Sequence, residues 1–180
     1  MKRYTVPVNI VVLSITLALG GVRLAAQTDP TIGTWVLNVA KSKFTSEPAP
    51  KSESRKYVLE GQQTSLTSKQ SSEPRRYVSV RQEIKATSER VDGDGRSTTV
   101  EWTIVYDGRD RPMTGDLDAD TLSAQRVDAV TTTFTQKRDG RVVIIGKVTI
   151  SSDGKLMTIT TQGVNAKGQA IDDVLVFDKQ

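Results

Sequence analysis

The stretch Thr98–Tyr106, TTVEWTIVY, decides the fold that this sequence predicts. Large apolar side chains occupy every second position, at Val100, Trp102, Ile104 and Tyr106. The residues between them are expected to point the other way: Glu101, Thr103 and Val105. A period of two places one row of side chains on each face of an extended chain, so the stretch predicts a half-buried β-strand.

The same reading extends outward from this strand in both directions. Further runs are rich in Val, Ile, Thr, Tyr and Phe, which suit a pleated sheet. They are Trp35–Val39, Lys56–Glu60, Tyr77–Thr87, Thr121–Asp128, Val130–Lys137, Arg141–Ser151, Lys155–Gln162 and Asp172–Asp178. Gln62–Lys69 fits either a strand or a loop, and beyond the first 26 residues no stretch shows a helical period over three turns. We therefore predict an all-β protein.

Turn signals separate these runs at short intervals. Asp-Gly pairs suit tight hairpins because both positions tolerate a positive φ. They stand at 92–93, 94–95, 107–108, 139–140 and 153–154. Successive strands should therefore pair as antiparallel neighbours, and closure of the sheet would remove its two exposed edges. The sequence predicts a single antiparallel up-and-down β-barrel of 8–10 strands.

One stretch after the first strand is unlike a strand. Lys41–Glu53, KSKFTSEPAPKSE, contains two prolines, which cannot donate to a β-ladder, and Phe44 is its only large apolar residue. Two interpretations stay open. The stretch is either a lid over one end of the barrel or a surface loop held in place by Phe44.

The first 26 residues have the pattern of an export signal. Lys2 and Arg3 precede the apolar run VPVNIVVLSITLAL, and small residues follow at Ala25 and Ala26. This predicts a signal peptide at 1–26, a domain at 27–180, and a secreted or periplasmic protein. The apolar run is shorter than the roughly 20 residues that span a bilayer, so we expect no stable membrane span after cleavage.

Composition excludes several classes of function. The chain has 180 residues with no Cys and no His, so disulfides, thiolate nucleophiles, Ser-His-Asp triads and ordinary zinc sites are excluded. The leader holds three of the 25 basic residues and no acidic one, so its removal lowers the net charge from +4 to +1. With charges of both signs interspersed, we expect no nucleic-acid partner.

Metal and catalytic sites also lack a convincing pattern. Asp116, Asp118 and Asp120 alternate like the start of a calcium loop, but the turn-forming Gly and the distal Glu of a helix–loop–helix site are absent. No pair of carboxylates stands out for acid–base work. We expect no metal, no cofactor and no enzymatic activity.

Several segments together carry a family resemblance. Gly33-Thr34-Trp35 opens the first strand and resembles the G-x-W signature of the lipocalins. GTWVLNVAKSKF, Pro-Ala-Pro-Lys at 48–51, YDGRDRPMTG and the ending VFDKQ resemble the uncharacterised, secreted lipocalin-like proteins of soil bacteria, particularly acidobacteria. The resemblance implies a barrel of eight to ten strands in which Gly33 and Trp35 close one end. It also raises Arg126 as a candidate for the late Arg that often covers this Trp, and it brings no catalytic residues.

A barrel of this size either fills its interior with side chains or keeps a cavity for one small ligand. The alternation predicts these inward residues: Tyr57, Leu59, Trp102, Ile104, Tyr106, Leu122, Phe134, Ile144, Leu156 and Phe177. As ligand-binding residues we single out Tyr57, Trp102, Tyr106, Phe134 and Arg126. An inward guanidinium at Arg126 would hold a carboxylate through two bonds, and the alternative is pairing with Asp128 or solvent.

The function expected from the sequence is therefore binding rather than catalysis. The predicted activity is that of an exported monomer that takes up a small apolar or amphipathic ligand in its barrel. The alternative is a filled barrel that serves as a structural or protein-interaction module.

Overall fold

A computed structural model describes residues 28–45, 48–68 and 76–180 of the chain. The predicted signal peptide at 1–26 lies outside these residues. Within them, no helix has the length and apolar character needed to cross a membrane. The only helical element described is a short 3-10 turn, η1 (Val39–Lys41).

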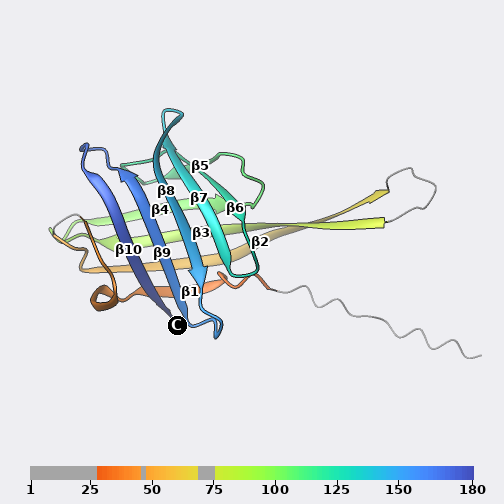
Figure 1. Ribbon diagram of the computed structural model, residues 1–180, viewed down its shortest axis with the longest axis horizontal. Helices are drawn as coiled ribbons and strands as arrows, with labels where there is room; N and C mark the ends of the chain where they lie inside the picture. The colour runs from red at the N-terminus through yellow and green to blue at the C-terminus, as the bar shows by residue number, and fades with distance from the viewer. Residues whose placement is uncertain (1–27, 46–47, 69–75) are drawn as a thin grey trace, which may run out of the picture.

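The described residues form ten strands that close into one barrel (Figure 1). The strands are β1 (Gly33–Leu37), β2 (Ser52–Ser68), β3 (Arg76–Val91), β4 (Ser97–Ile104), β5 (Arg111–Thr114), β6 (Thr121–Arg126), β7 (Thr131–Arg138), β8 (Arg141–Ile150), β9 (Leu156–Val164) and β10 (Ala170–Lys179). Each strand pairs with its neighbours in the chain, and every pairing is antiparallel. The all-β, up-and-down barrel is confirmed.

The barrel closes through its first strand. β1 pairs with β2 on one side and with β10 on the other, where Leu37 lies opposite Phe177. Trp35 stands opposite Arg55 of β2 and Lys179 of β10. These five residues of β1 form the seam of the sheet and remove its free edges.

Three details of the predicted strands are wrong. β4 ends at Ile104, so the alternation stops there, and Val105 is buried at 4% exposure instead of pointing outward. Glu53 belongs to β2 rather than to the preceding loop, because β2 begins at Ser52. The short β5 has no counterpart among the predicted strands. It has four residues, one of which, Pro112, cannot donate to a ladder.

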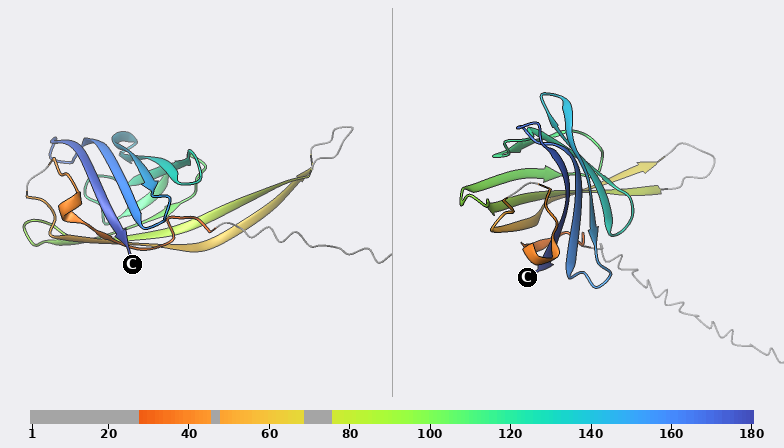
Figure 2. Two further views of the ribbon diagram at one scale, coloured as in Figure 1. Left: turned by 60° about the horizontal axis from the view of Figure 1, so that its bottom comes forward. Right: turned by 60° about the vertical axis from the view of Figure 1, so that its left-hand side comes forward.

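β2 and β3 are longer than the barrel needs. β1 pairs with β2 only as far as Tyr57, and β4 pairs with β3 only from Ile84. Beyond these residues the two strands run on as a two-stranded ribbon (Figures 1 and 2). Leu59 is 40% exposed at the base of the ribbon, so its predicted inward position is wrong. By that point β2 has left the barrel wall.

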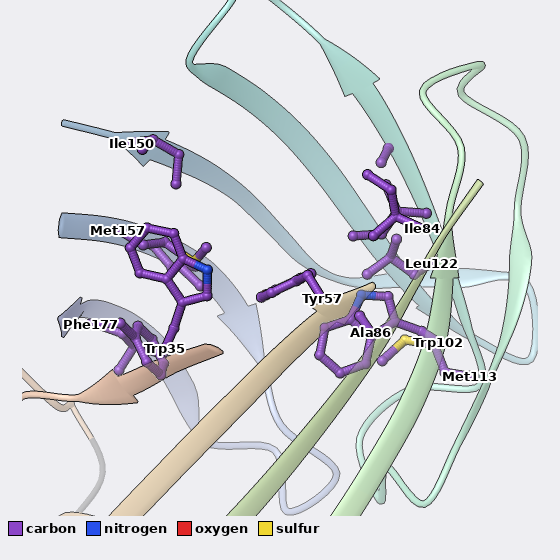
Figure 3. Close-up of a cluster of buried hydrophobic side chains, with 14 of the residues drawn as sticks. Trp35, Tyr57, Ile84, Ala86, Trp102, Met113, Leu122, Ile150, Met157 and Phe177 are labelled. Atoms are coloured by element: carbon purple, nitrogen blue, oxygen red, sulfur yellow. The ribbon is translucent and has the colours of Figure 1, made fainter. Parts of the chain in front are cut away.

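The core concentrates around the closed end of the barrel. Trp35, Phe177, Ile84, Met157 and Ile159 are the largest fully buried side chains. In Figure 3, Trp35 lies beside Met157 and Phe177, and Tyr57 lies between this group and the group around Trp102. The Nε1 group of Trp35 donates a 2.8 Å hydrogen bond to the Thr31 carbonyl oxygen, so the one polar atom of the ring is satisfied.

A cation lies against this tryptophan. The Lys179 Nζ atom is 4.9 Å from the centre of the Trp35 ring. Gly33 has φ +131°, and a Cβ atom there would lie 2.9 Å from Lys179 Cε. A glycine at this position therefore leaves room for the lysine stem to lie across β1 and reach the ring.

Candidate functional site

A cavity of about 500 Å³ enters the barrel from the end opposite the Trp35 cluster. Its rim is formed by turns between strands, including Asp92–Arg96, Asp116–Asp118 and Asn165–Lys167. Leu117 stands at this rim with 66% of its side chain exposed. Deeper in the barrel, the wall includes Thr31 and Thr132. The volume lies within the roughly 300–1,000 Å³ of small-molecule sites.

Three of the five predicted ligand-binding residues meet in this cavity. Tyr57, Trp102 and Phe134 all line it. The rings of Tyr57 and Trp102 meet edge to face, with centres 6.1 Å apart and planes at 84°. Phe134 lies on the opposite wall against Gly146, where a Cβ atom would lie 2.3 Å from the Phe134 ring. The predicted apolar residues Ile104, Leu122 and Ile144 also line the cavity.

Tyr106 and Arg126 lie elsewhere and do not line this cavity. The guanidinium of Arg126 is 3.9 Å from the centre of the Tyr106 ring and forms an ion pair with Asp29. Asp29 also accepts hydrogen bonds from the backbone N–H and the hydroxyl of Thr31. Arg126 therefore ties the segment before β1 to the closed end of the barrel. Its ion-pair partner is Asp29, the charge of Asp128 also acts on it, and the cation over Trp35 is Lys179 rather than Arg126.

The main polar group of the cavity wall is a pair that the sequence analysis missed. Arg55 and Glu53 stand on β2 and line the cavity together with Tyr57. Arg55 Nε donates a 2.6 Å hydrogen bond to Glu53 Oε1, which also accepts a 2.8 Å bond from the Ser88 hydroxyl. Glu53 Oε2 accepts no hydrogen bond within the described residues and lies 3.7 Å from Arg90 Nη1.

The environment shifts the pKa values of this pair in opposite directions. Burial by itself raises the pKa of Glu53, but the charge and hydrogen bond of Arg55, the charge of Arg90 and the Ser88 hydrogen bond together hold it below 4.5. Burial by itself lowers the pKa of Arg55, but Glu53 and Tyr57 raise it above its ordinary value. Both side chains are therefore ionised at neutral pH. Burial also raises the pKa of Tyr57, which keeps its hydroxyl neutral.

The stability of the barrel should fall in acid partly through Glu53. A carboxyl whose pKa is lower in the folded state stabilises the fold above its unfolded pKa of about 4.3. This stabilisation is lost as the pH falls through the lower folded value. We expect Glu53→Gln to be less stable than the wild type at pH 7, with the difference shrinking below about pH 4.5. Urea unfolding at pH 7, 5, 4 and 3 measures this, and a difference independent of pH would contradict it.

The signal for the missed pair was present in the sequence. Tyr57 was correctly placed facing inward, and residues two and four positions before it share its face of the strand. Arg55 and Glu53 occupy those positions. They were missed because the predicted strand began at Lys56, after these two charged residues.

The loop before β2 lies at the rim of the cavity. Phe44 packs against the core and lines the cavity together with Pro48. The loop is joined to β10, because Thr45 N–H donates a 2.6 Å bond to Asp173 Oδ1 and the Thr45 hydroxyl accepts a 2.9 Å bond from Asp172 N–H. Phe44 thus holds the loop in place, and the loop also covers part of the cavity rim.

The aspartates of the β5–β6 connection accept hydrogen bonds from backbone N–H groups of turns. Asp116 Oδ1 accepts a bond from Asp118 N–H, Asp118 Oδ1 accepts one from Ala166 N–H, and Asp120 Oδ2 accepts one from Asp139 N–H. The first bond lies within one turn and the other two join this connection to neighbouring turns, which is an ordinary role of Asp in loops.

Comparisons with protein-family models, with curated proteins and with solved structures each gave no match to this chain.

Proposed function

We propose that the protein binds a small apolar or amphipathic molecule inside its barrel and that it does so without catalysis. The observation that carries this proposal is the cavity of about 500 Å³ lined by the rings of Tyr57, Trp102 and Phe134. Rings on facing walls offer flat apolar contacts to a ligand between them. A barrel filled by its own side chains would leave no space of this size, so the cavity favours binding over the filled-barrel alternative.

The proposal places this binding outside the cytoplasm, in the periplasm or beyond the cell. Its support is the leader pattern of residues 1–26 and the absence of Cys, which leaves the domain independent of the redox state of its compartment. We further propose a monomer, since closure of the barrel through β1 leaves no barrel strand in need of a partner chain.

The neutral fluorophore N-phenyl-1-naphthylamine tests this function directly. We expect its fluorescence to rise on titration with the protein and to saturate at one molecule per barrel. Ala124→Leu should weaken binding by on the order of tenfold, because Ala124 lines the cavity and a larger side chain fills it.

Gln125→Leu is the matched control for this variant. Gln125 is the next residue on β6, is exposed and does not line the cavity. This variant should bind the fluorophore as the wild type does. Absence of saturable binding, or equal weakening in both variants, would contradict a ligand site inside the barrel.

A further inference from the structure

An arginine side chain is enclosed within the apolar interior of the barrel. Arg55 has a side chain that is 18% exposed, and its guanidinium lies 4.9 Å from the centre of the Phe177 ring and 5.8 Å from that of Trp102. Desolvation of a charge is costly unless partners compensate for it. Arg55 lines the ligand cavity. The protein groups that already bind its guanidinium therefore determine which polar group of a ligand can bind there as well.

The protein itself engages only part of this guanidinium. Arg55 Nε donates to Glu53 Oε1, and the Tyr57 hydroxyl accepts a further side-chain hydrogen bond from the guanidinium. A guanidinium has five N–H donors, of which four belong to the Nη groups. Glu53 and Tyr57 therefore orient the side chain and leave the remaining Nη donors for another acceptor.

The deep charged cluster holds two bases beside the buried carboxylate of Glu53. Arg55 lies 2.6 Å and Arg90 3.7 Å from its oxygens, and the negative charge of Asp116 also acts on Arg55. Asp92 lies 3.5 Å from Arg90, but on the rim side, with 38% of its side chain exposed. Water and salt weaken the charges of the rim more than those inside the barrel.

We propose that the cavity is selective for an amphipathic organic acid, whose carboxylate or sulfonate group binds the Nη groups of Arg55. The apolar part then lies against Trp102 and Phe134, which line the same cavity. This proposal rests on the proposed function and names the class of its ligand. Pairing of a guanidinium with a planar carboxylate through two hydrogen bonds gives both strength and orientation. Glu53 acts as a positioning residue, because it holds the guanidinium without touching the ligand.

Competition between two ligands of equal chain length tests the charge preference. Dodecanoate and dodecan-1-ol would each displace N-phenyl-1-naphthylamine at pH 8, where the acid is ionised. We expect the wild type to bind dodecanoate about tenfold more tightly than the alcohol, in line with a hydrogen bond to a charged group. Arg55→Gln should abolish this preference while the affinity for the alcohol changes little.

Two further variants separate a ligand contact from a structural role. Glu53→Gln keeps an oxygen acceptor for Arg55 Nε and Ser88 but removes the negative charge, so dodecanoate should bind about threefold more tightly or better. Lys56→Gln removes the same charge as Arg55→Gln from the exposed neighbouring position and should leave the preference intact. Where Arg55→Gln does not fold, Glu53→Gln/Arg55→Gln takes its place, since it leaves no unpaired buried charge.

The outcomes distinguish the two proposals. Failure of the wild type to bind the neutral fluorophore overturns the proposed function and this inference with it. Binding of the fluorophore with equal affinities for acid and alcohol overturns only the inference. An unchanged or weaker affinity of Glu53→Gln for dodecanoate overturns it as well.

Discussion

Replacement of Trp35 by alanine is expected to lower the free energy of unfolding by about 3–5 kcal/mol, the usual cost of removing a large buried ring. The side chain is fully buried among Met157 and Phe177 and donates its N–H to the Thr31 carbonyl. It also stands on β1, which pairs with both ends of the sheet. Loss of the ring therefore weakens the core and the seam of the barrel together. Urea denaturation of both proteins, followed by far-ultraviolet circular dichroism, gives the difference.

Two variants of the same strand control this prediction. Val36→Ala changes the neighbouring side chain, which is 38% exposed and outside the core cluster, and should cost less than about 1 kcal/mol. Trp35→Phe keeps a ring but leaves the Thr31 carbonyl without its donor. Its decrease in free energy of unfolding should lie between those of Trp35→Ala and Val36→Ala. If Trp35→Ala costs no more than Val36→Ala, Trp35 does not hold the seam closed.

The fold was predictable because its determinants are local. Alternation over TTVEWTIVY and similar runs fixes which face of each strand is apolar, and Asp-Gly pairs fix where the chain turns. Closure then follows from the cost of two free edges. The errors arise where a strand leaves the barrel wall although its sequence pattern continues. The alternation of β2 continues to Leu59, but β1 pairs with β2 only up to the Gly33–Tyr57 pair. No local pattern in β2 marks that limit.

The site was predicted less completely because it depends on which end of the barrel a side chain occupies. Alternation placed Tyr57, Trp102 and Phe134 inside, and all three line the cavity. Alternation does not show, however, how far along the barrel axis a side chain lies. Arg126 was therefore proposed as a ligand contact although it lies at the closed end with Asp29. Arg55 was overlooked because the predicted strand began at Lys56, so neither Arg55 nor its buried partner Glu53 was assigned to a face of the sheet.

Replacement of Arg55 by glutamine is expected to destabilise the protein by about 3–5 kcal/mol at pH 7, which is the usual cost of breaking a buried ion pair. The variant leaves the Glu53 carboxylate, whose side chain is 2% exposed, with the Ser88 hydroxyl as its hydrogen-bond donor and Arg90 at 3.7 Å. Glu53→Gln/Arg55→Gln should recover most of this loss, because it removes the unpaired charge and keeps the shape of both side chains. Urea unfolding of the two single variants and the double variant measures their coupling.

The response to pH separates an unpaired charge from a packing defect. In Arg55→Gln the main cause of the lowered pKa of Glu53 is gone, so we expect burial to outweigh the Arg90 charge and the Ser88 hydrogen bond and to raise that pKa above its unfolded value. The unpaired Glu53 carboxylate then destabilises the fold at any pH above its folded pKa. This destabilisation is relieved as the pH falls toward the unfolded pKa of about 4.3, because the carboxyl in the folded protein becomes neutral. The difference in free energy of unfolding between the wild type and Arg55→Gln should therefore be smaller at pH 5 than at pH 7. Lys56→Gln should have the same free energy of unfolding as the wild type at both pH values. A gap of constant size would mean that Arg55 stabilises the barrel by its packing against Phe177 and Trp102 rather than by its charge.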